Sequence, residues 1–170
     1  MLYADHGRDM KTAMSGYGYI VMIYGLRPLS RGRVGLHSAD PSAAPLIDPA
    51  YLSDPADVER LVRGVRLVRT ILAQPAFEPH HDVEVSPGEP LLTDDDLADW
   101  VRRSAESAYH PVGTCKMGID PMAVVDDQLK VHGIEGLRVA DASIMPTMVA
   151  SNTNAPSIMI GEKASDLVLA

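Results

Sequence analysis

Residues 104–118 read SAESAYHPVGTCKMG, and they place the only cysteine of the chain five residues after a histidine. Pro111 and Gly113 stand around this histidine and cysteine, and both residue types favour a loop over a helix or a strand. A histidine in a loop can act as a base, and a cysteine near a histidine can act as a nucleophile. The segment therefore predicts a loop with two candidate reactive side chains, His110 and Cys115.

The bulk properties of the chain exclude several classes of protein. Its 170 residues are enough for one domain with its own core, and a formal charge of −8 argues against nucleic acid as a partner. One cysteine excludes an internal disulfide and a cysteine-rich zinc site, and the scattered histidines predict no metal. The sequence shows neither a signal peptide nor an apolar run of roughly 20 residues, so we expect a cytoplasmic protein without a transmembrane segment.

Two amphipathic helices are predicted before this loop. Asp54 is a favourable N-cap and Pro55 suits the first helical position, and apolar residues then recur every three or four positions to about residue 72. The four arginines of this helix lie on its other faces, where we expect solvent. Thr93 and Asp96 predict a capping box for a second helix that carries Trp100.

Strands and a last helix complete the expected fold. Residues 17–26, YGYIVMIYGL, predict a buried strand, and residues 33–38, RVGLHS, predict the second arm of a hairpin. Residues 40–51 are expected to form a loop, and residues 137–140, LRVA, a further buried strand. A helix over about 155–169 is apolar nearly all round its first two turns, which predicts burial on several sides. Hairpins with separate helices indicate an α+β fold, with helices packed on an antiparallel sheet.

The residues alone leave more than one kind of chemistry open. A nucleophilic Cys115 would need a lowered pKa and a base within hydrogen-bond reach, and five residues along a loop do not settle that reach. A buried structural thiol is the commoner role for a single cysteine. No G-x-S-x-G turn supports a serine hydrolase.

Three segments in order give a more specific pattern. AYHPVGTCKMG (108–118), GLRVADASIMP (136–146) and SNTNAPSIMIGEKASDL (151–167) together resemble the C-terminal part of the glucose–methanol–choline (GMC) family of FAD-dependent oxidoreductases. The likeness is strongest to the branch of choline and alcohol dehydrogenases. RPLSRGRVGLHSADP (27–41) also matches the substrate domain of that family, so the resemblance extends over about residues 16–169.

The resemblance implies a catalytic pair. His110 would accept the proton of a small primary alcohol while a hydride passes from the carbinol carbon to FAD, which suits an imidazole at neutral pH. Asn152 would donate a hydrogen bond to the oxygen that loses this proton. His110, more than Cys115, is therefore the residue expected to carry the chemistry.

The same resemblance implies contacts to the cofactor. Asp141 and Ala142 would lie at the ribityl–pyrophosphate portion of FAD, and Thr153 and Asn154 near the flavin ring, largely through their backbone. Without the resemblance, the favoured interpretation of Asp141 is a turn cap, and that of the two asparagines is ordinary caps before the last helix.

The resemblance also implies what lies outside the chain. The sequence has no G-x-G-x-x-G turn for the ADP half of FAD, so an N-terminal FAD-binding domain would be missing from it. Residues 1–123 would form the substrate-domain sheet and helices, and residues 124–170 would return to the flavin domain, the two being treated as one compact unit. The surface left uncovered would favour a homo-oligomer. The alternative is a non-catalytic remnant or accessory domain that binds a partner without redox chemistry.

Overall fold

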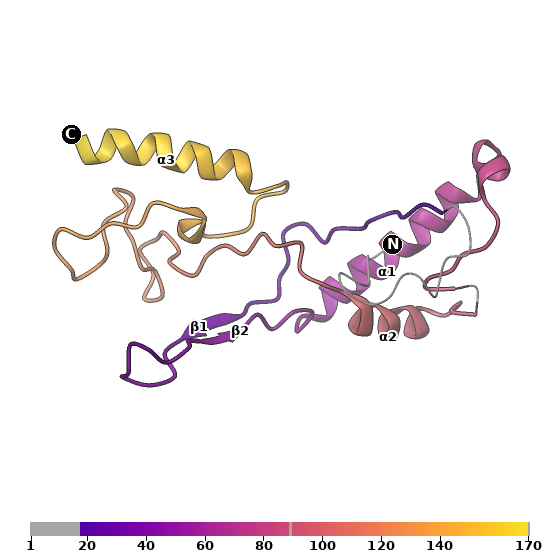
Figure 1. Ribbon diagram of the computed structural model, residues 1–170, viewed down its shortest axis with the longest axis horizontal. Coiled ribbons are helices and arrows are strands. Elements are labelled where there is room, and N and C mark those ends of the chain that lie inside the picture. The colour runs from indigo at the N-terminus through magenta and orange to yellow at the C-terminus, as the bar shows by residue number, and fades with distance from the viewer. Residues whose placement is uncertain (1–17, 89, 170) are drawn as a thin grey trace. The chain divides into compact units, whose positions relative to one another are not determined.

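The structure is a computed structural model, and it describes residues 18–88 and 90–169. The described residues form two compact units, one with residues 18–25 and 51–108 and the other with residues 26–50 and 109–169 (Figure 1). The expected division of the chain between residues 123 and 124 separates the substrate-domain part from the part that would return to a flavin domain, and it stays a prediction. Within the described residues, no helix is both long enough and apolar enough to cross a membrane.

Two helices build the core of the first unit. α1 (Pro55–Leu72) begins at Asp54, whose side chain accepts a hydrogen bond from the backbone N–H of Ala56 at 2.9 Å. α2 (Asp94–Ser104) begins with the predicted capping box of Thr93 and Asp96, so both predicted helix starts are confirmed. The buried side chains come from one face of each helix: Val58, Leu61, Val62 and Val65 from α1, and Leu97, Trp100 and Val101 from α2. A short 3₁₀ helix, η2 (Pro75–His80), follows α1.

The segment before this core is extended but forms no strand, so the prediction of a buried strand over residues 17–26 is wrong for its described part, residues 18–26. Its alternation is present, because Val21 and Ile23 are half-buried while Met22 and Tyr24 are more than half exposed. Ile23 packs against the α1 core, and a Cβ at Gly64 would come within 2.6 Å of the Ile23 side chain. A strand needs a hydrogen-bonded neighbour, and the expected partner over residues 33–38 pairs elsewhere.

The arginines of α1 differ in their surroundings, which corrects the expectation that all of them face solvent. Arg63 is 68% exposed and lies 3.9 Å from Glu59. Arg69 is only 24% exposed, and its guanidinium donates to both carboxylate oxygens of Glu84 at 3.1–3.2 Å. It also donates to the carbonyl oxygens of Leu91 at 2.8 Å and Gly88 at 3.1 Å. Arg69 thus holds the connection between η2 and α2 against α1.

Replacing this arginine is expected to destabilise the first unit. Arg69→Met keeps an unbranched apolar stem but leaves one carboxylate and two backbone carbonyls without their donor, a loss of about 1–3 kcal/mol. Urea unfolding followed by the fluorescence of Trp100, the only tryptophan, measures this loss. Arg63→Met is the matched control, because an exposed ion pair contributes about 0–1 kcal/mol. Equal stabilities of the two variants would contradict the anchoring role.

A small antiparallel sheet belongs to the second unit and confirms the α+β class. β1 (Arg33–Gly35) pairs with β2 (Leu46–Asp48), and Val34 lies opposite Ile47. β1 falls within the predicted strand over residues 33–38, but β2 lies in the stretch expected to be a loop. The hairpin therefore joins β1 to the chain that follows it and not to the chain before it.

Loops that meet in single β-bridges form most of the second unit. Met117 bridges Val125, Val125 bridges Val131, and Lys130 bridges Arg138. The predicted strand over residues 137–140 is thus reduced to one bridge, although Val139 is half-buried and packs on the core. This core consists of Val125, Leu129, Ile144, Met145, Ile160 and Ala164.

The last helix is less covered than its sequence predicts. α3 (Asn154–Leu169) lies over the core of the second unit, and only Ile160 and Ala164 are buried (Figure 1). Ile158, Met159 and Val168 are each about 60% exposed, so the expected burial on several sides does not occur within the described residues. α3 packs one narrow face on the core and presents apolar side chains elsewhere.

Candidate active site

His110 lies in a loop whose backbone is tightly constrained. Tyr109, the residue before it, has a φ of 61°, which is uncommon for a non-glycine residue, and Gly113 has a φ of 88°. Beyond the loop, the backbone N–H of Cys115 donates to the carbonyl of Ser143, and that of Met117 to the carbonyl of Ile144. These bonds hold the loop next to η3 (Ala142–Ile144), whose end belongs to the buried core.

The start of α3 brings two side chains to His110 from more than forty residues away. The hydroxyl oxygen of Thr153 lies 2.8 Å from His110 Nδ1, and the amide nitrogen of Asn152 lies 2.9 Å from Nε2. Thr153 is buried and Asn152 is exposed, while His110 is half-buried. Each ring nitrogen of His110 thus has one side-chain partner, and both partners come from the residues just before α3.

The Asn152 side chain is itself oriented by the backbone. The backbone N–H of Asn154 donates to Asn152 Oδ1 at 2.8 Å, which turns the amide nitrogen of Asn152 toward the imidazole. The Thr153 carbonyl accepts hydrogen bonds from the backbone N–H and the hydroxyl of Ser157, as the first turn of α3 forms. The site is therefore built on a helix start that fixes both partners of His110.

The arrangement bears on the alternative of a thiol nucleophile. Cys115 is half-buried, and its backbone N–H is used in the pairing with Ser143. The two ring nitrogens of His110 are hydrogen-bonded to Thr153 and Asn152 and not to the Cys115 thiol. Cys115 has the place of a structural residue in the loop.

The other predicted site residues lie on the same two segments. Asp141 caps η3, and hydrogen bonds from the side chain and the backbone N–H of Ser143 hold the pKa of its carboxyl below its usual value. Ala142 is half-buried, whereas Asp141 and Asn154 are exposed and can reach a ligand. The Thr153 hydroxyl is engaged by His110, so Thr153 could contact a cofactor only through its backbone.

Gly113 is the position where a small change is expected to disturb the loop most. Gly113→Ala would force a side chain into a left-handed backbone, which costs roughly 1–2 kcal/mol, and would place its Cβ 3.2 Å from the Met145 carbonyl oxygen. We expect faster hydrogen exchange at the backbone N–H groups of Cys115 and Met117. The matched control is Gly133→Ala, at a φ of 76° with open space around it. If Gly113→Ala and Gly133→Ala changed the exchange rates of the Cys115 and Met117 N–H groups equally, the contact with Met145 would not matter.

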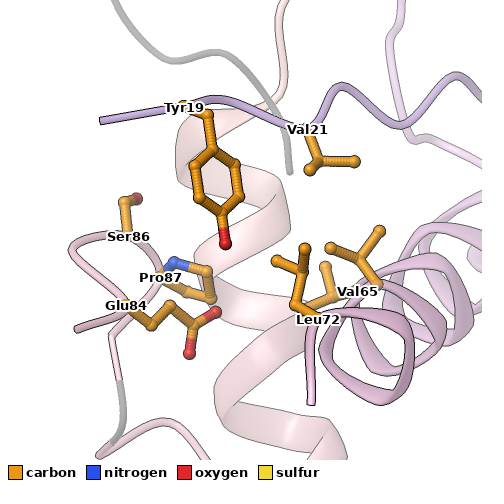
Figure 2. A pocket seen from close by; sticks show the side chains of 8 residues that line it. Tyr19, Val21, Val65, Leu72, Glu84, Ser86 and Pro87 are labelled. Atoms are coloured by element: carbon orange, nitrogen blue, oxygen red, sulfur yellow. The ribbon is translucent and has the colours of Figure 1, made fainter. Parts of the chain in front are cut away.

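A small pocket lies in the first unit, apart from these residues. It is lined by Tyr19, Val21, Val65, Val68, Leu72, Glu84, Ser86 and Pro87. Figure 2 shows the Tyr19 ring extending into it from the N-terminal segment. Its volume of about 40 Å³ has room for a few water molecules, far less than the roughly 300–1,000 Å³ of typical small-molecule sites. The pocket is therefore no substrate site of the chain by itself.

Sequence patterns did not reveal the contact between Thr153 and His110. The resemblance placed Thr153 near a flavin ring, and its position just before a helix is also that of an ordinary cap residue. The left-handed backbone of Tyr109 had no sequence signal either, because tyrosine rarely adopts it. Both features depend on how the loop and the helix start are packed.

Comparisons with known proteins agree on one family. The sequence profile described as GMC oxidoreductase matches residues 28–161. An alcohol dehydrogenase [acceptor] from Pseudomonas putida is 49% identical over 165 residues, which are 97% of this chain and 29% of that protein. An oxygen-dependent choline dehydrogenase from Brucella ovis is 47% identical over 163 residues, 95% of this chain and 30% of that protein.

A solved structure gives the same result for the fold. The FAD-dependent oxidoreductase from Chaetomium thermophilum superposes with a TM-score of 0.79 at 33% identity, over 84% of this chain and 25% of that one. The chain thus spans less than a third of the length of the relatives it matches, and the match falls in their C-terminal part.

Proposed function

The chain belongs to the GMC oxidoreductase family, and on this premise we propose that it provides the substrate side of a flavin-dependent alcohol oxidation. The proposed substrate is a small primary alcohol and the product its aldehyde. The proposed cofactor is FAD, held mainly by a flavin-binding part outside these 170 residues. The names of the relatives support this proposal, since they include alcohol and choline dehydrogenases and an FAD-dependent oxidoreductase.

The observation that carries the proposal is the contact of His110 with Asn152. The Asn152 amide donates to His110 Nε2 at 2.9 Å, so this nitrogen has its lone pair available for a hydrogen bond. An alcohol hydroxyl that replaces the amide would donate to the same lone pair. The imidazole is then placed to accept the hydroxyl proton.

Asn152 has a second role once the alcohol is bound. Its Oδ1 is held by the Asn154 N–H, so its amide N–H groups stay near Nε2 and would donate to the alcohol oxygen. Negative charge grows on this oxygen as its proton moves to His110, and a fixed donor stabilises that charge. The hydroxyl proton would go to His110 Nε2 as the C=O bond of the aldehyde forms, and the C–H electron pair would leave as hydride for an acceptor that the cofactor would supply.

The residues present suit the flavin end of the cofactor. When bound, FAD would accept the hydride from the carbinol carbon. Asp141 is exposed, and its lowered pKa keeps its carboxylate ionised as an acceptor for hydroxyl groups such as those of a ribityl chain. Asn154 is exposed at the start of α3, and since its backbone N–H is donated to Asn152, its side-chain amide would be the group that contacts polar ligand atoms.

The proposal is tested by reducing the flavin with alcohols. The protein used is the polypeptide that contains both this chain and its flavin-binding part. It is mixed under anaerobic conditions with choline, benzyl alcohol or n-butanol, and the flavin absorbance is recorded. We expect at least one alcohol to bleach the flavin band and to yield its aldehyde. A flavin that dithionite reduces but none of these alcohols bleaches would contradict the proposal and favour a non-catalytic binding domain.

Two expectations from the sequence stay predictions. A homo-oligomer through exposed apolar surface agrees with the exposure of Ile158, Met159 and Val168 on α3, and sedimentation of the purified chain would measure it. The second expectation is a cytoplasmic location.

A further inference from the structure

We propose that Thr153 is a positioning residue that holds His110 in its Nδ1–H tautomer, and thereby leaves Nε2 unprotonated to act as the base. The inference rests on the proposed function, because it names the residue that prepares the base of that reaction. The position of the proton on the His110 ring is a property of the 170-residue chain, so it can be measured without any enzymatic turnover.

The argument starts from a backbone group whose role is fixed. The N–H of Asn154 can only donate, so the atom of Asn152 that lies 2.8 Å from it is the side-chain oxygen. The remaining atom of that amide, 2.9 Å from His110 Nε2, is therefore the nitrogen. An amide nitrogen donates and does not accept, so Nε2 must be the unprotonated, accepting nitrogen of the ring.

A neutral imidazole carries one proton, which must then lie on Nδ1. Nδ1 is 2.8 Å from the Thr153 hydroxyl oxygen, so the ring donates this proton to Thr153. Three hydrogen bonds thus run in one direction. The Asn154 N–H donates to the Asn152 oxygen, the Asn152 amide nitrogen donates to Nε2, and Nδ1–H donates to the Thr153 hydroxyl. The hydrogen bond at one ring nitrogen sets the protonation of the other.

Thr153 is well suited to hold this bond. It is 8% exposed, and its carbonyl accepts the first hydrogen bonds of α3 from Ser157, so its backbone is fixed. Its branched side chain has few rotamers, which limits the movement of the hydroxyl. Free neutral histidine favours the Nε2–H tautomer, in which the proton blocks the nitrogen needed as base. The Asn152 amide opposes that preference by donating to Nε2, and the Thr153 hydroxyl opposes it by accepting the proton of Nδ1.

Nitrogen NMR of the 170-residue chain labelled with ¹⁵N-histidine tests the inference directly. Nδ1–H and Nε2–H tautomers give distinct pairs of nitrogen signals, and the His110 pair is assigned by its loss in His110→Gln. We expect the Nδ1–H pattern in the unchanged chain and in Thr153→Ser, and a shift toward Nε2–H in Thr153→Val. Thr147→Val, at an exposed threonine of the same segment, is the matched control and should change nothing. An unchanged tautomer in Thr153→Val would overturn the inference.

Kinetics separate this inference from the proposed function. In the FAD-loaded polypeptide, Thr153→Val is expected to lower kcat by about 10–100-fold, as for other partners that orient a functional histidine, with little change in KM. Thr153→Ser should restore most of the rate. A changed tautomer with unchanged kcat would contradict His110 as the base, and so the proposed function, while the positioning by Thr153 would stand.

Discussion

His110→Ala is expected to lower kcat by roughly 10²–10⁴-fold in the FAD-loaded polypeptide, the range that a general base contributes. The substitution removes the nitrogen that would accept the alcohol proton, and water at this position lacks the basicity of an imidazole. Flavin content should stay the same, because His110 contacts Asn152 and Thr153 and is not among the proposed cofactor contacts. Anaerobic mixing with a reducing alcohol, followed at the flavin band, measures the rate of hydride transfer.

The control for this experiment is His37→Ala, at an exposed histidine in the loop after β1. It should leave the rate of flavin reduction unchanged. Near-normal turnover of His110→Ala would remove this residue from the role of base.

Leu97→Ala is expected to cost about 2–5 kcal/mol of the free energy of unfolding of the first unit. Leu97 is completely buried in α2, and its truncation leaves a cavity among Val58, Val62 and the other side chains of the α1–α2 core. Small domains are stable by only about 5–15 kcal/mol, so this loss is a large share of the total. Denaturant unfolding followed by Trp100 fluorescence reports on this unit alone, because Trp100 lies in the same core.

Leu92→Ala provides the matched control, since the same truncation is made at a leucine that is 69% exposed. Its effect should stay within about 0.5 kcal/mol. Both variants should keep the His110 signals of the second unit, which shares no core residue with the first. A Leu97→Ala variant as stable as Leu92→Ala would mean that this core does not hold α2 in solution.

The helices and the family could be inferred from the sequence because their causes are local or ordered along the chain. The cap at Asp54 and the capping box of Thr93 and Asp96 act within one turn, so a few neighbouring residues determine where each helix begins. The motifs around His110 and before α3 identify the family, as the match to residues 28–161 confirms.

The strands and the surface of α3 could not be inferred in this way. A strand depends on a partner, and β1 pairs with β2 although residues 18–26 have the stronger strand composition. The apolar character of α3 predicts burial, yet in the part of the chain that the structure describes only Ile160 and Ala164 of this helix are buried. What packs on a segment is a property of the whole fold.

The sequence by itself determined the helix starts, the family and the identity of His110 and Asn152 as candidates. Only the tertiary structure decided that Thr153 shares the imidazole with Asn152, and that Arg69 is bound into the connection before α2 and not solvated. The physical reason is the same in both cases. A hydrogen bond is fixed by atoms within about 3 Å of each other, and the two residues of such a pair can lie more than forty positions apart in the chain.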